Sequence, residues 1–283
     1  MKGTSSRTIE AHALVPPGRG GGVFWRHRWV ALGGATAMGV IVFLLLWELI
    51  LNVLHVPRYV LPPPSAIFRQ FQRHFSLIWR YTLVTEAEVL VGYAVAIALG
   101  VPLAAFIAFS KFLERTLYPS TVALEMVPKI AFAPLFVTWF GFSFLPKIII
   151  VMLITFFPII LNGILAFRSL IPELFYFSRS TGAGPWMMFW KVRAPAALPQ
   201  LFVGLKIAAT NAAVGAVIAE WIGGDAGLGY YLQISAGNMW TDLSFGIIVL
   251  LSVLGLALYY AVSVAERKLI PWHVSQRVLQ ARS

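Results

Sequence analysis

The sequence predicts an all-α membrane protein built as a bundle of six transmembrane helices. Hydrophobic residues make up 59% of the 283 residues and the mean hydropathy is +0.80, so there is too little polar surface to cover a water-soluble core. The apolar residues gather into six segments of about 20 residues, the length at which a helix crosses a hydrocarbon core about 30 Å thick. Because these segments lack strict two-residue alternation, they predict helices and not barrel strands.

The six segments set the organisation of the chain. The first is longer than the apolar region of a signal peptide, and no convincing small-residue cleavage site follows Ile50, so we expect an uncleaved helix. The expected spans are residues 29–51, 84–109, 119–140, 146–167, 202–222 and 244–264. They form a transmembrane domain at residues 29–265, between an N-terminal tail at 1–28 and a C-terminal tail at 266–283.

A short amphipathic helix is expected between the first two spans. Three prolines, Pro62 to Pro64, and Ser65 precede the run from Ala66 to Phe71, a pattern typical of a helix start. We expect this helix at the outer surface, where it either packs at the membrane interface or contacts a partner.

Proline and small residues recur inside the later spans. Proline frees backbone carbonyls and small residues let helices approach closely, so these spans predict either hinges or static kinks. The prolines are Pro102, Pro128, Pro134 and Pro158, and the small residues near the first of them are Gly92, Gly100, Ala104 and Ala105.

The distribution of Lys and Arg predicts that both termini lie in the cytoplasm. In this orientation most of the 22 basic residues fall on cytoplasmic loops and tails, as the positive-inside rule requires. The loop after the first span opposes the rule, because it carries Arg58, Arg69, Arg73 and Arg80. The net charge of +11 is not gathered on one aromatic-interleaved face, so the expected partner surface is membrane lipid and not nucleic acid.

A polar island at residues 168–200 lies between two apolar spans and predicts a cytoplasmic docking loop. Gly182 permits a sharp reversal, because glycine reaches positive φ without steric cost. Pro195 and Pro199 are expected to close the loop before the chain re-enters the membrane. A folded loop in a membrane protein without a soluble domain needs a partner to contact.

The sequence shows no sign of an enzyme active site, and no cofactor or metal is expected. There is no Cys, which excludes disulfides, thiolate catalysis and Cys-ligated metals. No phosphate-binding loop is present, so ATP must bind to another protein, and the glycines of residues 223–229 predict a tight outer turn instead. The five His never occur four residues apart, which leaves metal ligation unsupported.

Charged residues inside the spans are functional candidates, since each costs about 2.5 to 3.5 kcal/mol at a helix centre. Glu125 and Lys129 are four residues apart and can pair; the pair either braces a helix kinked by proline or lines a substrate pathway. Glu220, near the outer end of its span, either serves an outer gate or a binding-protein contact, or reaches water. Glu86 and Glu88 are expected to be solvated.

Several short motifs occur in order along residues 57–273. They are Pro128-Lys129-Ile130-Ala131, Pro134-Leu135, Trp139-Phe140-Gly141, Glu220, Gly227-Leu228-Gly229-Tyr230 and Ile270-Pro271-Trp272-His273. In this order and spacing they resemble the inner-membrane permease subunit of a bacterial ATP-binding-cassette (ABC) importer, in the nitrate, sulfonate and taurine branch. That branch includes carriers of thiamine-precursor pyrimidines and riboflavin. The resemblance implies a type I ABC importer permease in the bacterial inner membrane.

Such permeases carry a cytoplasmic motif of Glu-Ala-Ala, three residues, Gly, nine residues and Ile-x-Leu-Pro, which forms a coupling helix on the ATPase subunit. By this resemblance the coupling turn and its following positions are Gly182, Ala183, Val192 and Pro195. The match is partial, because Tyr176, Phe177 and Ser178 replace Glu-Ala-Ala, and Ala194 replaces the leucine.

The resemblance also implies partners and a transport cycle. A homodimer of this chain would bind two ATPase subunits on its cytoplasmic loops and a periplasmic or lipid-anchored substrate-binding protein on its outer face. Closure of the ATPases would move the coupling loops and switch access between inside and outside. The expected pathway residues are Glu125, Lys129, Trp139, Asn162, Asn211 and Glu220. The alternative is an ATP-independent secondary transporter or channel, which paired broken helices in two inverted halves would favour.

Two substrate classes remain open. Lys129 could attract an anion such as a sulfonate, taurine or nitrate, whereas Trp139, Phe140, Phe156 and Phe157 could stack on the flat ring of a pyrimidine or flavin.

Overall fold

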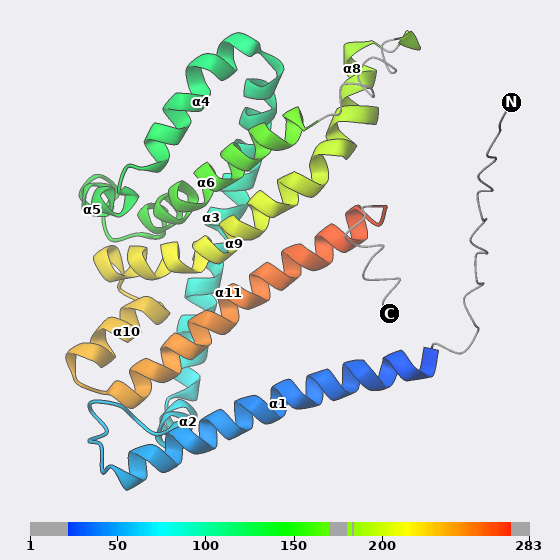
Figure 1. The fold of residues 1–283 in the computed structure, drawn as a ribbon. Coiled ribbons are helices and arrows are strands. Elements are labelled where there is room, and N and C mark those ends of the chain that lie inside the picture. Colours follow the sequence, from blue (N-terminus) through cyan, green and yellow to red (C-terminus); the bar gives the residue numbers. More distant parts are fainter. Residues whose placement is uncertain (1–21, 170–179, 183, 273–283) are drawn as a thin grey trace, which may run out of the picture.

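The computed structural model of the chain describes residues 22–169, 180–182 and 184–272. These residues form a bundle of long helices (Figure 1). The helices that run the length of the bundle are α1 (Gly22–Val53), α3 (Phe75–Phe109), α6 (Phe144–Arg168), α9 (Ala194–Gly223) and α11 (Thr241–Leu269). Within these ranges α3, α6, α9 and α11 are long and apolar enough to cross a membrane, and α1 contributes the shorter apolar stretch Met38–Val53. Their order is the one predicted from the apolar segments.

Shorter helices connect the long ones. They are α2 (Pro64–Arg73), α4 (Lys111–Glu125), the 3-10 turn η1 (Lys129–Phe132), α5 (Ala133–Phe140), α8 (Pro185–Met188), the π turn η2 (Phe189–Arg193) and α10 (Leu228–Gly237). Helix α2 confirms the predicted amphipathic helix, because it buries Ala66 and half-buries Ile67 and Phe71 while its polar residues Arg69, Gln72 and Arg73 are exposed. In α1, Glu48 accepts hydrogen bonds from the backbone N–H and the hydroxyl of Ser65 at 3.0 and 2.7 Å, which ties α2 to α1.

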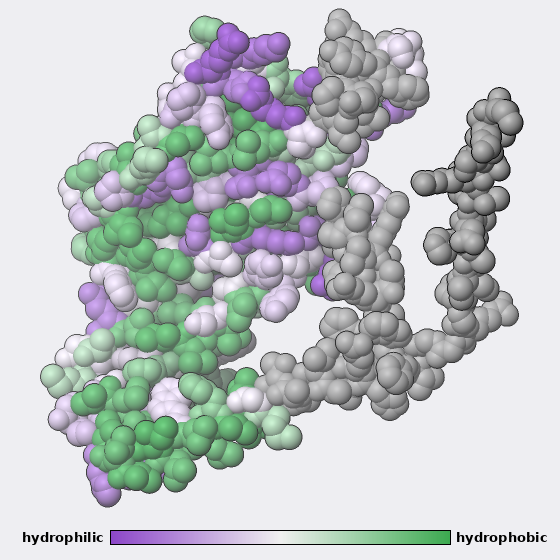
Figure 2. All heavy atoms as spheres, in the orientation of Figure 1, coloured by the Kyte–Doolittle hydropathy of each residue, from purple (hydrophilic) through white to green (hydrophobic). Residues whose placement is uncertain are grey.

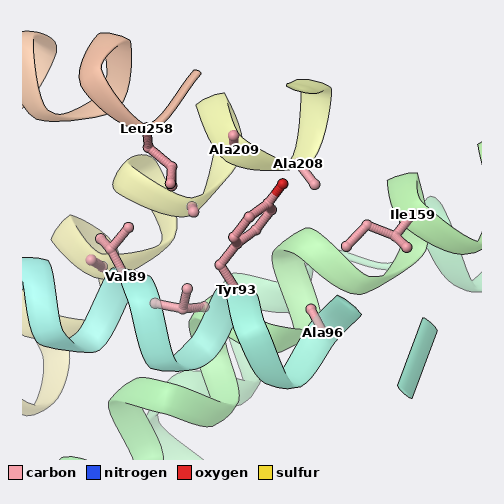
Figure 3. Packing of buried hydrophobic residues seen from close by; sticks show 10 residues of the cluster. Val89, Tyr93, Ala96, Ile159, Ala208, Ala209 and Leu258 are labelled. Atoms are coloured by element: carbon pink, nitrogen blue, oxygen red, sulfur yellow. The ribbon is translucent and has the colours of Figure 1, made fainter. Parts of the chain in front are cut away.

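Helices α6 and α9 form the centre of the bundle, with α3 packed mainly on α6 and α11 on α9. Figure 3 shows Tyr93 of α3 pointing toward Ala208 and Ala209 of α9. Its hydroxyl donates a 2.8 Å hydrogen bond to the carbonyl of Leu205. The ring therefore fills the space that the small side chains leave, and its polar group is satisfied inside the bundle.

The third predicted span is not one helix. Helix α4 ends at Glu125, the chain resumes as η1 and α5, and the two halves are bent by 78°. Pro128 has no N–H with which to continue the helix, and its ring disfavours helical backbone in the residue before it. Pro134 lies in the first turn of α5, where proline is tolerated. The predicted span over residues 119–140 is therefore a broken one, and the break lies at Pro128, one of the prolines predicted to hinge or kink the spans.

The loop predicted at residues 168–200 ends earlier than expected. Helix α9 begins at Ala194, so Pro195 and Pro199 lie inside its first turns and do not close the loop ahead of it. Pro195 closely follows the π turn η2, so it removes one N–H donor where the backbone already departs from regular α-helical hydrogen bonding. Together with α8 and η2, residues Trp186–Gly223 make one helix of 38 residues.

Ion pairs join the helices at the end of the bundle that carries this loop. Arg168 at the end of α6 pairs with Glu114 of α4, and Lys206 of α9 pairs with Glu266 of α11. Figure 2 shows hydrophilic residues gathered where α3 meets α4, and mainly apolar residues over the described part of α1. This distribution fits a bundle whose sides face lipid and whose ends face water.

Candidate functional site

The broken segment α4–α5 holds the predicted pair Glu125 and Lys129. The ammonium group of Lys129 lies 3.0 Å from the Glu125 carboxylate and also donates a 2.7 Å hydrogen bond to the Glu125 carbonyl. In a continuous helix that carbonyl accepts from the peptide N–H of residue 129, so the lysine side chain replaces a hydrogen bond that the break removes. The same ammonium lies 4.7 Å from the ring centre of Phe157 in α6, a cation–π contact. The predicted pairing is confirmed, but the two residues lie on either side of a helix break and not on one face of a continuous helix.

Exposed apolar side chains surround the break. Met126 is 79% exposed and Trp139 is 64% exposed, and the ring of Phe136 packs edge-on against Trp139 with centroids 5.8 Å apart. Irregular backbone does not face lipid directly, because lipid offers its N–H and C=O groups no hydrogen-bond partner. The exposed break therefore requires protein or a water-filled space against it.

A second polar cluster lies where α9 ends and α10 begins. Glu220 is fully buried, and its carboxylate accepts a 2.6 Å hydrogen bond from the hydroxyl of Thr85 in α3. It also accepts from the N–H groups of Gly229 and Tyr230 at 2.5 and 3.1 Å. These two donors belong to the first turn of α10, where unpaired N–H groups and the helix dipole favour an anion. Glu220 thus caps α10 and ties it to α9 and α3, and the predicted alternative that it reaches water was wrong.

Glu88 and Lys147 complete this cluster, although neither was predicted to belong to a functional site. Glu88 is fully buried, and its carboxylate lies 3.1 Å from the ammonium group of Lys147, which also reaches Asp225 at 3.4 Å. The expectation that Glu88 is solvated was wrong, because its side chain faces other helices and not the end of the bundle. The signal was available: Glu88 and Lys147 carry opposite charges and both lie inside predicted apolar spans.

Asn162 and Asn211, the polar residues predicted for the pathway, are half-buried on α6 and α9. Asn162 donates a 2.9 Å hydrogen bond to the carbonyl of Pro158 and accepts a 3.3 Å hydrogen bond from Gln200, so it joins α6 to the start of α9. The predicted pathway residues therefore do not form one site. Glu125, Lys129 and Trp139 lie on the broken segment, whereas Asn162 lies on α6 and Asn211 and Glu220 lie on α9.

The loop predicted to couple to an ATPase is described in part. Gly182 has φ 76°, the left-handed conformation that the predicted turn requires. Val192 lies half-buried in η2, and Pro195 lies half-buried in α9. The other predicted coupling residues, Tyr176, Phe177, Ser178 and Ala183, lie outside the described residues.

Two tryptophans stand out on the described part of this loop. Trp186 is 75% exposed and Trp190 is 56% exposed, and their rings meet edge to face with centroids 5.7 Å apart. Exposed indole rings are typical of surfaces that contact another protein and of the membrane–water interface.

A family model matches residues 96–271, which include the broken segment, Glu220 and the loop. Its description is "binding-protein-dependent transport system inner membrane component". The chain belongs to this family. It is therefore the transmembrane permease subunit of an ABC importer, a multi-pass membrane protein, as the sequence motifs indicated.

Relatives and a solved structure agree with this assignment. The permease is 34% identical to the riboflavin transport system permease protein of Chloroflexus aurantiacus, over 88% of this chain and 93% of that protein. It is 33% identical to the formylaminopyrimidine transport permease protein of Halalkalibacterium halodurans, over 83% of this chain and 94% of that protein. The inward-facing MetNI methionine ABC transporter matches at 20% identity with a TM-score of 0.60, over 70% of this chain and 98% of that chain. The last match confirms the predicted type I importer permease fold.

Proposed function

We propose that two copies of this permease enclose the substrate pathway between them, and that α4–α5 of each copy lines it. The observation that carries this proposal is the exposed break, where the side chain of Glu125 is 37% exposed and that of Lys129 is 13% exposed. A break of this kind needs protein or water against it in a membrane, and one copy leaves it uncovered. A second copy facing the first across a water-filled path supplies both.

Two ATPase subunits and a substrate-binding protein complete the proposed importer. The ATPases dock on the loop before α9, with the exposed Trp186 and Trp190 as contacts and Gly182 as the turn. The further coupling positions in this proposal are Tyr176, Phe177, Ser178, Ala183, Val192 and Pro195. Lys191 and Arg193 on η2 support a cytoplasmic position for the loop. In this proposal both termini lie in the cytoplasm and the permease lies in the bacterial inner membrane.

The geometry favours a flat heteroaromatic substrate over a small anion. Glu125 neutralises Lys129 at 3.0 Å, so the pair offers an anion little net attraction. Trp139 and Phe136 beside it offer ring surface for stacking. The relatives at 34% and 33% identity are named for riboflavin and formylaminopyrimidine, whereas those named for aliphatic sulfonates and taurine are 30% and 25% identical. We therefore assign a vitamin or vitamin precursor with a planar ring.

The purified permease alone is expected to show neither ATP hydrolysis nor concentrative uptake in proteoliposomes. Both activities should appear when its ATPase and binding protein are added, because this chain has no phosphate-binding loop. Labelled riboflavin and labelled taurine, offered in parallel, test the substrate class, and accumulation of taurine alone would contradict the assignment. Accumulation by the lone chain under an imposed proton or sodium gradient would instead favour the ATP-independent transporter.

The double variant Glu125→Gln with Lys129→Met is expected to reach the membrane at wild-type abundance and to lose uptake by about tenfold or more. Removing both charges leaves no unpaired ion in the membrane and takes the side-chain donor from one carbonyl alone, that of Glu125, so the fold persists while the pathway loses its polar lining. Each single change leaves one unpaired charge and should lower abundance as well. The measurement is uptake normalised to membrane abundance. Normal uptake by the double variant would show that the pair braces the break and does not line the pathway.

A further inference from the structure

An apolar groove opens between α1, α2 and α11, toward the end of the bundle opposite α8 (Figure 1). Its volume of about 590 Å³ lies within the range of about 300–1,000 Å³ that small-molecule sites occupy. The side chains that line it include Leu44 of α1, Phe68 and Phe71 of α2, and Val249 and Val253 of α11. All of these except Phe71 are exposed, at 39% for Leu44, 62% for Phe68, 57% for Val249 and 53% for Val253. One copy of the chain therefore leaves the groove open.

The groove begins beside a helix that has the pattern of the membrane interface and continues along a membrane-spanning helix. Helix α2 carries Phe68 and Phe71 on one face and Arg69 and Arg73 on the other, which is typical of a helix lying in the interface. From there the groove follows residues 246–253 of α11, a length of about 10 Å at 1.5 Å per residue. A narrow apolar channel that starts at the interface and runs inward suits the acyl chain of a lipid.

The wall of the groove holds a hydrogen-bond donor without an acceptor. Trp47 of α1 lines the groove, and its ring meets that of Phe245 in α11 edge to face with centroids 6.3 Å apart. The indole N–H of Trp47 is buried and has no acceptor among the residues that the structure describes. Buried donors in proteins are nearly always paired, so the occupant of the groove is expected to supply an oxygen here. The ester and phosphate oxygens of a phospholipid are acceptors of this kind.

The two arginines of α2 give this corner of the bundle a positive charge. Helix α2 contains no acidic residue, and in the described part of the chain neither Arg69 nor Arg73 forms an ion pair. Glu48 of α1 lies nearby, but its carboxylate accepts two hydrogen bonds from Ser65. Arginine side chains are long enough to extend to the headgroup layer, where they attract anionic lipids more strongly than lipids without net charge.

We propose that the groove binds an anionic phospholipid, with an acyl chain along α11 and the phosphate at Arg69 and Arg73. In the proposed importer the second copy faces α4–α5, which packs on α6 and α9, so the groove of α1, α2 and α11 stays open to the membrane. The lipid joins α1 to α11 along a side where α1 contacts the described bundle mainly through α2. The site therefore combines an apolar channel, an unpaired indole donor and two arginines.

The test uses the complete transporter in phosphatidylcholine nanodiscs that contain a trace of photoreactive lipid, with the cross-linked residues mapped by mass spectrometry. Photoreactive phosphatidylglycerol should label the groove at least about tenfold more than photoreactive phosphatidylcholine with the same acyl chains, because each arginine near the headgroup adds about fivefold to the affinity for an anionic lipid. The double variant Arg69→Gln with Arg73→Gln should reduce this preference to within about twofold. Its control, Lys111→Gln with Arg115→Gln, removes the same charge from exposed positions of α4 and should keep the preference.

A second pair of variants tests the position of the acyl chain. Leu44→Trp places a larger ring in the groove and should lower the labelling of α11 by both lipids by about fivefold or more. The matched control is Leu45→Trp, since Leu45 is 64% exposed but does not line the groove, and its labelling should equal that of wild type.

Three results would overturn the proposal. Equal labelling of the wild type by the two lipids would show ordinary exchanging membrane lipid only, and a preference that survives the loss of Arg69 and Arg73 would place the anionic site elsewhere. Labelling of the groove by neither lipid would show that protein covers it, as a helix of the second copy would. Substrate uptake by the same complex is measured in parallel, so failure of the lipid site is distinguished from failure of the proposed function.

Discussion

The Lys147→Met variant is expected to reach the membrane at a small fraction of the wild-type abundance. Its side chain is 4% exposed, and removing it leaves Glu88 buried without a cation beside it. Breaking a buried ion pair from one side costs about 3–5 kcal/mol, which is a large share of the stability of a typical domain. Membrane abundance and the Tm of the purified protein in detergent are the measurements.

Two variants control this experiment. The double variant Glu88→Gln with Lys147→Met should regain most of the lost abundance, because it leaves neither partner of the pair as an unpaired charge. Lys206→Met removes the same type of side chain from the Lys206–Glu266 pair and should cost less, because the carboxylate that it leaves is 11% exposed whereas that of Glu88 is fully buried. Wild-type abundance and Tm for Lys147→Met alone would contradict the buried pair.

Gly227→Ala is expected to destabilise the permease through the contact between α9 and α10. Gly227 has φ 119° and ψ 169°, a region open essentially to glycine, and a non-glycine residue there costs about 1–3 kcal/mol. A Cβ atom at this position would also lie closer than 3.0 Å to the carboxylate of Glu220 and push it from the N–H groups that it caps. Abundance, Tm and uptake should all fall.

The matched control is Gly237→Ala at the other end of α10. An added Cβ there meets no atom within 4 Å, and the backbone does not have positive φ. This variant should behave as wild type, and a similar loss in both variants would show that α10 is sensitive to any change and not to the contact with Glu220.

Hydropathy predicted where the long helices lie but not which of them are continuous. Pro102 and Pro158 lie inside the unbroken helices α3 and α6, whereas Pro128 ends α4 and starts a 78° bend. The three prolines look alike in the sequence, because each removes one N–H and clashes with the preceding turn. Neighbouring helices, Ser or Thr side chains and local adjustments can satisfy the carbonyl that a proline frees, so the proline alone does not decide whether a membrane helix breaks.

The polar clusters were predictable only where their members are close in sequence. Glu125 and Lys129 are four residues apart, so their pairing followed from helical spacing. The partners of Glu220 come from Thr85 and from the start of α10, and those contacts depend on how three helices pack. The sequence therefore shows which charged residues lie in apolar spans, but it does not show which residues they contact.

The helix from Trp186 to Gly223 connects the loop at one end of the permease to α10 at the other. At 1.5 Å per residue its 38 residues extend about 57 Å, well beyond the hydrocarbon thickness of a bilayer. One end carries the exposed tryptophans of the loop, and the other is fastened to α10 by Glu220. Figure 1 shows this helix curved, so its ends are less than about 57 Å apart, and a tilt of about 5° pivoting at the loop end would displace the far end by up to about 5 Å and carry α10 with it. In the proposed importer, a push on this helix from an ATPase at one face of the membrane would therefore move α10 at the other face.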